Sequence, residues 1–320
     1  MESQKRLFNY IQSILPDHVK PVNEISELLG TNTATTYERM GGRVPLKINE
    51  LVSLAEHFNL SLDEALGLKN DNIPFSYVLL AADDPEQYIR YMRGLEASIK
   101  RLAAAEHMEL TFAADDIPVF HFMNHPELTY FKLYAWYQSM SNVDGSYEQF
   151  MRSADDLELR GIFKGIAAAY RAIPTTEIWT EETISPMLSL LAHYRDFGKF
   201  DSSETLVMLC RQLLEILERV ERWAADSRKD GDSNAPYSLY LCPVQPGSSI
   251  MLSRRDGVPS VRIKLYTINS VATDNPILCE ETQKWMDQTI SKSTNLTRSS
   301  EIARARFFDG MKAKVRKLMP

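Results

Sequence analysis

Residues 28–46 read LLGTNTATTYERMGGRVPL, and this order predicts two short helices joined by a tight turn. Gly30 follows the first helix, where a glycine C-cap is common because glycine adopts the left-handed conformation at little cost. Asn32 can cap the second helix, which we expect to run to about Met40. The pair Gly41-Gly42 then stops that helix.

Helical patterns also flank this stretch. Apolar residues recur at helical spacing over 4–15, 22–29 and 47–58, and residues 61–64, SLDE, form a capping box that opens a further short helix. Residues 69–76 have the composition of a linker. The sequence therefore predicts a five-helix domain over residues 1–70.

The pattern changes twice beyond the linker. Helical periodicity dominates residues 77–228, which we expect to form an α-helical body for dimerisation or sensing. A polar loop or boundary follows at 226–236, and strands are then predicted at 237–244, 249–254 and 260–268, with helices near 277–292 and 299–319. The predicted fold class is mainly α: an N-terminal five-helix helix-turn-helix domain, an α-helical middle body and a small C-terminal α+β module over 237–320.

Residues 28–46 resemble the core of a lambda-repressor/Cro-like helix-turn-helix domain, and residues 51–66 are similar to the fourth helix of that family and its ending. The whole layout also resembles uncharacterised helix-turn-helix regulators common in Bacteroidetes, and residues 178–184, IWTEETI, are similar to the body of those proteins. The resemblance implies a cytoplasmic transcriptional regulator that binds double-stranded DNA and is not an enzyme. We expect a homodimer with an unknown small-molecule or protein effector.

In a helix-turn-helix the second helix lies in the major groove, and its first residues contact base edges. By the resemblance, Asn32 caps this helix, while Thr36 and Met40 pack inward. The expected base-reading residues are Thr33, Ala34, Thr35, Tyr37 and Glu38, and the expected phosphate contacts are Arg39, Arg43 and Lys47. Glu38 departs from the pattern because a carboxylate repels phosphate, although it can accept from a cytosine amino group.

The charge distribution argues against this function. The chain has a net charge of -7, and residues 1–70 hold 7 Lys and Arg against 9 Asp and Glu, whereas DNA-binding domains usually carry a basic face. An interaction adaptor that uses the N-terminal domain to bind protein is therefore the alternative. An enzyme with a site assembled from scattered residues is a third hypothesis, although the sequence has no catalytic motif that we recognise.

Three further groups of residues have both a functional and a structural interpretation. His107, His121 and His125 could bind zinc, but the prolines around the last two favour a turn or a core edge. The aromatic residues within 130–137 could line an effector pocket, but their helical spacing favours core; they are Tyr130, Phe131, Tyr134, Trp136 and Tyr137. The helix near 299–319 carries a basic coat for DNA, for the acidic body or for solvent.

No cofactor or metal site is predicted. Cys210, Cys242 and Cys279 are isolated in the sequence, which predicts buried reduced thiols. The chain has no apolar run long enough for a membrane span and no apolar signal core near Met1, so we expect no contact with a membrane.

Overall fold

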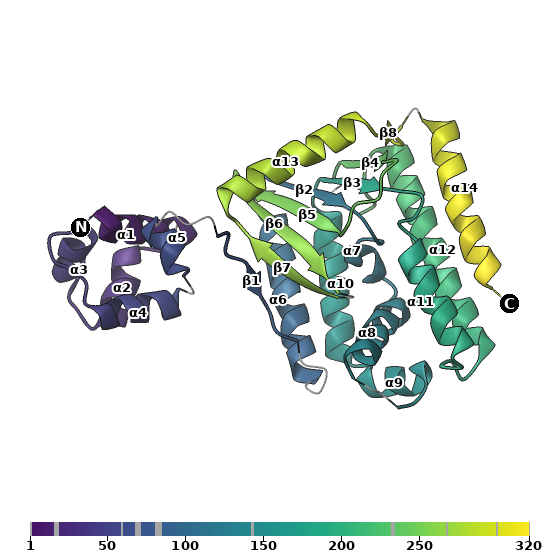
Figure 1. Cartoon of the computed structure of the whole chain (residues 1–320), viewed down its shortest axis with the longest axis horizontal. Coiled ribbons are helices and arrows are strands. Elements are labelled where there is room, and N and C mark those ends of the chain that lie inside the picture. The colour runs from purple at the N-terminus through teal and green to yellow at the C-terminus, as the bar shows by residue number, and fades with distance from the viewer. Residues whose placement is uncertain are drawn as a thin grey trace. The chain divides into compact units, whose positions relative to one another are not determined.

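The computed structural model describes residues 2–15, 19–58, 60–67, 72–80, 85–141, 144–231, 234–266, 268–298 and 300–319. These residues form two units, Met1–Pro74 and Phe75–Pro320, which we call unit 1 and unit 2 (Figure 1). Part of the predicted linker, residues 69–71, lies outside the described residues.

Unit 1 consists of short helices around a small apolar core. The helices are α1 (Glu2–Ile14), α2 (Pro21–Leu29), α3 (Thr33–Met40), α4 (Ile48–His57) and α5 (Leu62–Leu66). Leu7, Phe8 and Ile11 share one face of α1 because they are three and four residues apart, and they are buried against Ile25 and Leu54.

Unit 2 is built on an eight-stranded sheet with the order β1-β7-β6-β5-β2-β3-β4-β8. The strands are β1 (Ser76–Tyr77), β2 (Met108–Ala113), β3 (Thr175–Trp179), β4 (Tyr237–Leu241), β5 (Ile250–Arg255), β6 (Val258–Leu265), β7 (Asn269–Thr273) and β8 (Thr294–Asn295). The central pairs β2–β3 and β3–β4 are parallel, and the other pairs are antiparallel, so the sheet is mixed.

Helices cover both faces of this sheet (Figure 1). They are α6 (Pro85–Ala103), α7 (Val119–Phe122), α8 (Pro126–Met140), α9 (Tyr147–Ala154), α10 (Leu157–Arg171), α11 (Ser185–Asp196), α12 (Ser203–Asp226), α13 (Pro276–Ser291) and α14 (Glu301–Leu318). In the described part of the chain, none of these helices is long and apolar enough to cross a membrane.

The alternation of side chains along β3 separates two apolar cores. Ile178 belongs to a small core with Cys279 and Met286 of α13. Trp179 belongs to the large core on the other face, which also contains residues of α6, α8, α10 and α12. Glu177 points to the same face as Trp179, so a carboxylate enters the larger core.

The predicted fold class, mainly α, is wrong because the mixed sheet organises unit 2. The sheet takes β2 and β3 from residues 77–228 and β4 to β8 from residues 237–320, so the expected middle body and the expected C-terminal module share one sheet. The helices of unit 1 are short, and they do not by themselves establish a five-helix helix-turn-helix domain.

Several local expectations are nevertheless met in unit 2. The strands expected over 237–244, 249–254 and 260–268 are present as β4, β5 and β6, and the helices expected near 277–292 and 299–319 are present as α13 and α14. All three cysteines are free and buried, as predicted. The strands that were not foreseen, β1, β2, β3, β7 and β8, are the ones that turn these pieces into a single sheet.

Candidate functional site

The turn between α2 and α3 is set by Gly30. Its backbone is left-handed, with φ 61° and ψ 35°, and its N–H donates to the Glu27 carbonyl at 3.2 Å. The next N–H, that of Thr31, donates to the Ser26 carbonyl at 3.0 Å, which closes the last turn of α2. The Asn32 side chain then accepts from the Thr35 N–H at 2.8 Å and caps α3, as predicted.

A buried hydroxyl pair fixes α3 against α2. The Ser26 hydroxyl lies 2.6 Å from the Val22 carbonyl and 2.9 Å from the Thr36 hydroxyl. The Thr36 side chain is fully buried, in agreement with the expected inward position. Because these hydroxyls satisfy one another, the pair orients α3 without a cost for an unpaired polar group.

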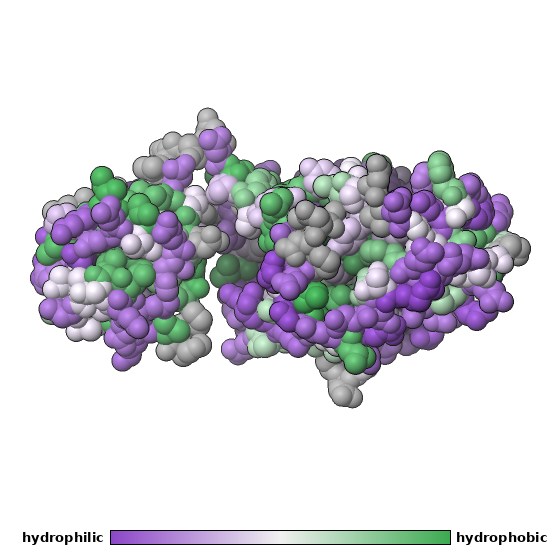
Figure 2. Space-filling model, turned by 90° about the horizontal axis from the view of Figure 1, so that it is seen from below, coloured by the Kyte–Doolittle hydropathy of each residue, from purple (hydrophilic) through white to green (hydrophobic). Residues whose placement is uncertain are grey.

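The other face of α3 is open to solvent. Asn32, Thr33 and Ala34 are exposed, Tyr37 is 58% exposed, and Thr35 is half-buried. Hydrophobic residues interrupt the hydrophilic surface of unit 1, at the left of Figure 2, and Ile48 and Val52 are among the exposed apolar residues of this unit. Of the five expected base-reading residues, Thr33, Ala34 and Tyr37 are therefore accessible on α3, whereas Thr35 and Glu38 are half-buried.

The charged residues around α3 are arranged differently from the prediction. Glu38 is half-buried, and its carboxylate forms an ion pair of 2.8 Å with the Arg43 guanidinium. Lys47 is exposed at the start of α4, its backbone N–H donates to the Glu50 carboxylate at 2.9 Å, and its ammonium forms no ion pair with the described residues. Lys47 is thus open to a phosphate, whereas Arg43 must share its charge with Glu38.

Arg39 does not lie where a phosphate contact needs it. Its residue is only 8% exposed, and the guanidinium pairs with the Glu50 carboxylate at 2.7 Å. The Gln4 side-chain amide donates to the carbonyls of Arg39 and Val44, both at 2.7 Å. The expected phosphate contact of Arg39 is corrected accordingly: Arg39 connects α3 to α4 inside unit 1.

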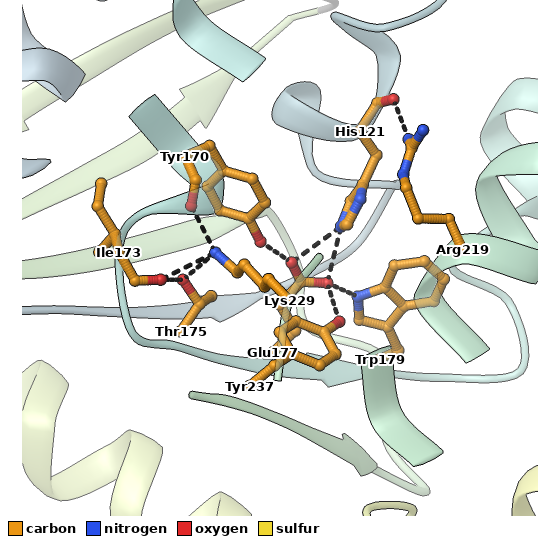
Figure 3. Close-up of polar contacts among 9 residues, drawn as sticks. All are labelled: His121, Tyr170, Ile173, Thr175, Glu177, Trp179, Arg219, Lys229 and Tyr237. Atoms are coloured by element: carbon orange, nitrogen blue, oxygen red, sulfur yellow. Dashed lines mark hydrogen bonds and ion pairs between the residues drawn. The ribbon is translucent and has the colours of Figure 1, made fainter. Parts of the chain in front are cut away.

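In unit 2 a group of buried polar side chains surrounds Glu177, whose side chain is fully buried (Figure 3). Its carboxylate accepts from the His121 ring at 2.9 Å and 3.1 Å, from the Trp179 indole N–H at 2.7 Å and from the Tyr237 hydroxyl at 3.0 Å. The Tyr170 hydroxyl donates to it as well. We call these five residues the Glu177 network.

Protonation in the network follows from burial and from these donors. Burial alone would raise the pKa of Glu177, but His121, Tyr170 and the nearby Lys229 outweigh burial and lower that pKa. Burial lowers the pKa of His121, so the neutral ring donates from Nε2. Burial also raises the pKa of Tyr237 well above its ordinary value, which keeps its hydroxyl a donor.

Lys229 completes the charge balance beside the network. Its ammonium donates to the carbonyls of Tyr170 and Ile173 at 2.7 Å and 2.9 Å and to the Thr175 hydroxyl at 2.7 Å. Burial lowers the pKa of Lys229, but three oxygen acceptors use all three N–H groups of an ammonium. The residue lies in the stretch 226–236 that we predicted to be a polar loop, of which 232–233 lie outside the described residues.

The histidines and the aromatic residues have structural partners. His121 bonds to Glu177, and His125 lies 3.4 Å from the Arg219 guanidinium. Among the described residues, no group of three or more His, Cys, Asp or Glu side chains is placed to hold a metal ion. The core interpretation of the five aromatic residues of α8 is confirmed, because Tyr130, Phe131, Tyr134, Trp136 and Tyr137 are all buried.

The basic coat of α14 is partly used inside unit 2. Arg304 is buried and donates to the carbonyls of Leu296 and Arg298. Lys312 pairs with Glu221 at 2.5 Å, and Lys314 pairs with Glu182 at 2.9 Å. Lys312 and Lys314 thus pair with acids of residues 77–228, whereas Arg306, Arg316 and Lys317 are exposed.

The sequence did not reveal the Glu177 network because His121 and Tyr237 are far from Glu177 along the chain and the five residues follow no motif. A glutamate inside the β-branched run 175–179 was the single local hint, since an acid in a buried strand needs donors. Comparison of the chain with protein-family models, with curated proteins and with solved structures found no match.

Proposed function

We propose that the chain is a sequence-specific DNA-binding regulator of transcription, acting in the cytoplasm without catalysing a reaction. The observation that carries this proposal is the exposed side of α3, formed by Asn32, Thr33, Ala34 and Tyr37, on a helix that the hydrogen bond between Ser26 and Thr36 holds against α2. Rigid presentation of polar side chains on one helix suits the major groove, which admits an α-helix and displays donors and acceptors on each base pair.

Within this proposal the residues divide into two roles. Thr33 and Tyr37 offer hydroxyls that donate and accept, so they choose the base sequence. Lys47 binds a phosphate oxygen, which supplies affinity without sequence choice. Arg43 joins it once the phosphate competes with Glu38 for the guanidinium.

We further propose that two copies of the chain act together as a homodimer. Residues 1–70 hold 7 Lys and Arg against 9 Asp and Glu, so few phosphate contacts are available to one copy. Non-specific binding of such a unit is expected to be about 10⁻⁴ M or weaker at physiological salt. Two linked units gain affinity because the second contact becomes intramolecular, and the binding site is then an inverted repeat.

Selection of bound sequences from a random DNA pool, with the full chain, tests the proposal. We expect an enriched inverted repeat whose half-site centres lie about 10 bp, or a multiple of that, apart. Tyr37→Ala should change the preferred bases, while Asn9→Ala, on the exposed side of α1, should not. A pool without any enriched sequence would contradict the proposal.

A specific observation favours the adaptor as the second candidate. Ile48 and Val52 lie four residues apart on α4 and are 79% and 43% exposed, so they form a small apolar stripe on unit 1. Apolar exposure of this kind suits a protein partner better than a phosphate backbone. Val52→Ser separates the two functions, because it should leave DNA affinity unchanged if DNA is the partner.

A further inference from the structure

Unit 2 contains a cavity of about 120 Å³ between α6, α7 and the strands β5 to β7, on the sheet face opposite α13. Its wall is mainly apolar and includes Tyr91, Met92, Leu95, Phe120, Met251 and Ile268. A protein cavity of about 150 Å³ holds benzene, so this space accepts a group of about that size. The five aromatic residues of α8 that we considered as a pocket lining are not among the residues around it.

One end of the cavity is charged. Successive side chains of β6 point to opposite faces of the sheet, so Val261 faces the core under α13 while Arg262 and Lys264 face the cavity. Lys264 pairs with Asp115 at 2.9 Å and lies 3.6 Å from Asp116.

Two lysines and two aspartates at this end cancel one another. Lys132 is buried, pairs with Asp116 and stands 5.0 Å from the centre of the Phe122 ring. With Lys264, it balances the charges of Asp115 and Asp116.

Arg262 is a further cation at this end of the cavity, in addition to the two lysines that balance Asp115 and Asp116. Its guanidinium donates to the Ser270 hydroxyl at 3.0 Å, and no carboxylate among the described residues forms an ion pair with it. Arg262 also lines a neighbouring cavity of about 220 Å³, together with the exposed Arg101 and Arg255 and a single acid, Asp274. The neighbouring cavity, which shares Leu95, Phe120, Met251 and Arg262 with the apolar cavity, is therefore lined by a net positive charge, which attracts anions.

A second observation points to a ligand with a hydrogen-bond donor. Asp116 lines the cavity and is 5% exposed, and its Oδ1 has no hydrogen-bond partner in the described part of the chain. Buried polar atoms without a partner are uncommon in folded proteins and call for an explanation. A cationic ligand would satisfy Asp116 but would also lie beside Lys132 and Lys264, so a neutral hydroxyl or N–H is the better donor.

We propose that unit 2 binds a small amphipathic organic anion. Its apolar part, of about the size of a phenyl ring, fills the cavity, and its carboxylate pairs with Arg262 in the bidentate geometry that guanidinium groups favour. A hydroxyl or N–H near the carboxylate adds a bond to Asp116 in the best ligands. This binding does not depend on DNA recognition by unit 1.

Three probes of equal length and different charge test the proposal by calorimetry on the full chain without DNA: 3-phenylpropionate, 3-phenylpropan-1-ol and 3-phenylpropylamine. We expect the acid to bind with a Kd of about 1 mM or lower, the alcohol at least about tenfold more weakly, and the amine most weakly. Absence of binding by all three probes, or an amine that binds best, would overturn the proposal.

Variants locate the site. Arg262→Gln should lower the affinity for the acid at least about tenfold, to that of the alcohol, and leave the alcohol unchanged. Arg306→Gln, at an exposed position of α14, is the matched control and should change nothing. Leu95→Phe, on α6, and Met251→Phe, on β5, each place a larger side chain in the cavity. Either variant, if it folds, should abolish binding of the acid and of the alcohol. An Arg262→Gln protein that still prefers the acid as strongly as the native chain would refute the assignment.

Discussion

In unit 1 the polar groups of Asn32, Thr33 and Tyr37 face solvent, whereas in unit 2 the hydroxyls of Tyr170 and Tyr237 close on a buried carboxylate. The two regions hold similar chemical groups but use them differently. Exposed donors cost nothing to leave without a protein partner, because water satisfies them until a ligand arrives. Buried donors must be satisfied within the fold, so the Glu177 network contributes to the stability and uniqueness of unit 2.

Removal of the Glu177 carboxylate should have the largest effect of all the changes, and it should lower the stability of unit 2 but not that of unit 1. Glu177→Ala leaves the donors of His121, Trp179 and both tyrosines without an acceptor and Lys229 without its counter-charge. We expect a loss of about 3–5 kcal/mol in the free energy of unfolding of unit 2. All four tryptophans lie in unit 2, at positions 136, 179, 223 and 285, so urea unfolding followed by tryptophan fluorescence measures it.

Tyr37→Ala is the comparison variant in unit 1, and it should leave that transition unchanged. If Glu177→Ala lowers the free energy of unfolding by less than about 1 kcal/mol, the Glu177 network does not contribute strongly to the stability of unit 2.

A change of pH should affect unit 2 next most strongly. Burial lowers the pKa of His121, and it lowers the pKa of His125 to about 4, so both rings are neutral in the folded chain at pH values where the unfolded chain binds protons. The stability contribution is present above the ordinary histidine pKa of 6.5 and is lost as the pH falls below that value. Each histidine contributes up to about 1.4 kcal/mol per pH unit.

Urea unfolding of the full chain between about pH 7.5 and about pH 5.5 measures this slope. His125→Gln should reduce the slope by the share of one histidine. Equal stability across this range would mean that the folded and unfolded chains bind the same number of protons, so that folding does not lower the pKa of either histidine.

Substitutions on the exposed face of α3 should change recognition rather than stability. Tyr37→Ala and Thr33→Val should each cost about 1–3 kcal/mol at one or two positions of the selected DNA site. Competition binding with single base changes in that site measures the cost. A uniform loss across all sequences would assign these side chains to phosphates instead.

A substitution in the turn before α3 should affect the stability of unit 1. Gly30→Ala meets no atom within 4 Å, but it places a Cβ on a backbone with φ 61°. We expect a cost of about 1–2 kcal/mol in unit 1, because L-residues with a side chain disfavour this conformation. Hydrogen exchange at the amides of Thr31 and Thr36 should accelerate, while exchange in β3 should not.

The smallest expected effect comes from the ion pair between Glu38 and Arg43. Glu38→Gln releases the Arg43 guanidinium for phosphate and should tighten binding to random DNA a few-fold at low salt. Glu56→Gln, on an exposed position of α4, removes the same charge away from α3 and serves as control. Equal affinities of the native chain and Glu38→Gln would show that this face does not approach phosphate.

The sequence predicted the features that depend on neighbouring residues. Gly30 and Asn32 determine a turn and a cap within a few positions, and the alternation in residues 260–264 marks β6 directly. The Asp-Gly turn before β6 is likewise a local signal.

Features that depend on distant partners were missed. β3 pairs in parallel with β2 and β4, which lie more than 60 residues away on one side and more than 50 on the other, and parallel pairing has no turn signal of its own. Glu177 would have argued against a buried strand, because three of its four donor residues, 121, 170 and 237, lie on other elements. The side-chain direction of Arg39 was missed for the same reason, since Glu50 lies on the next helix.

The two-residue strand β1 has a consequence for how the chain can be cut. Ser76 and Tyr77 pair with Ala272 and Val271 at the edge of the sheet, and Asn269 donates to the Tyr77 hydroxyl and the Val78 carbonyl. A fragment that begins after Tyr77 would uncover β7 as an open edge, and open edges template the addition of strands from other chains. Proteolysis just after Pro74 should therefore release a unit 2 that remains monomeric, whereas cleavage just after Val78 should give a product that aggregates.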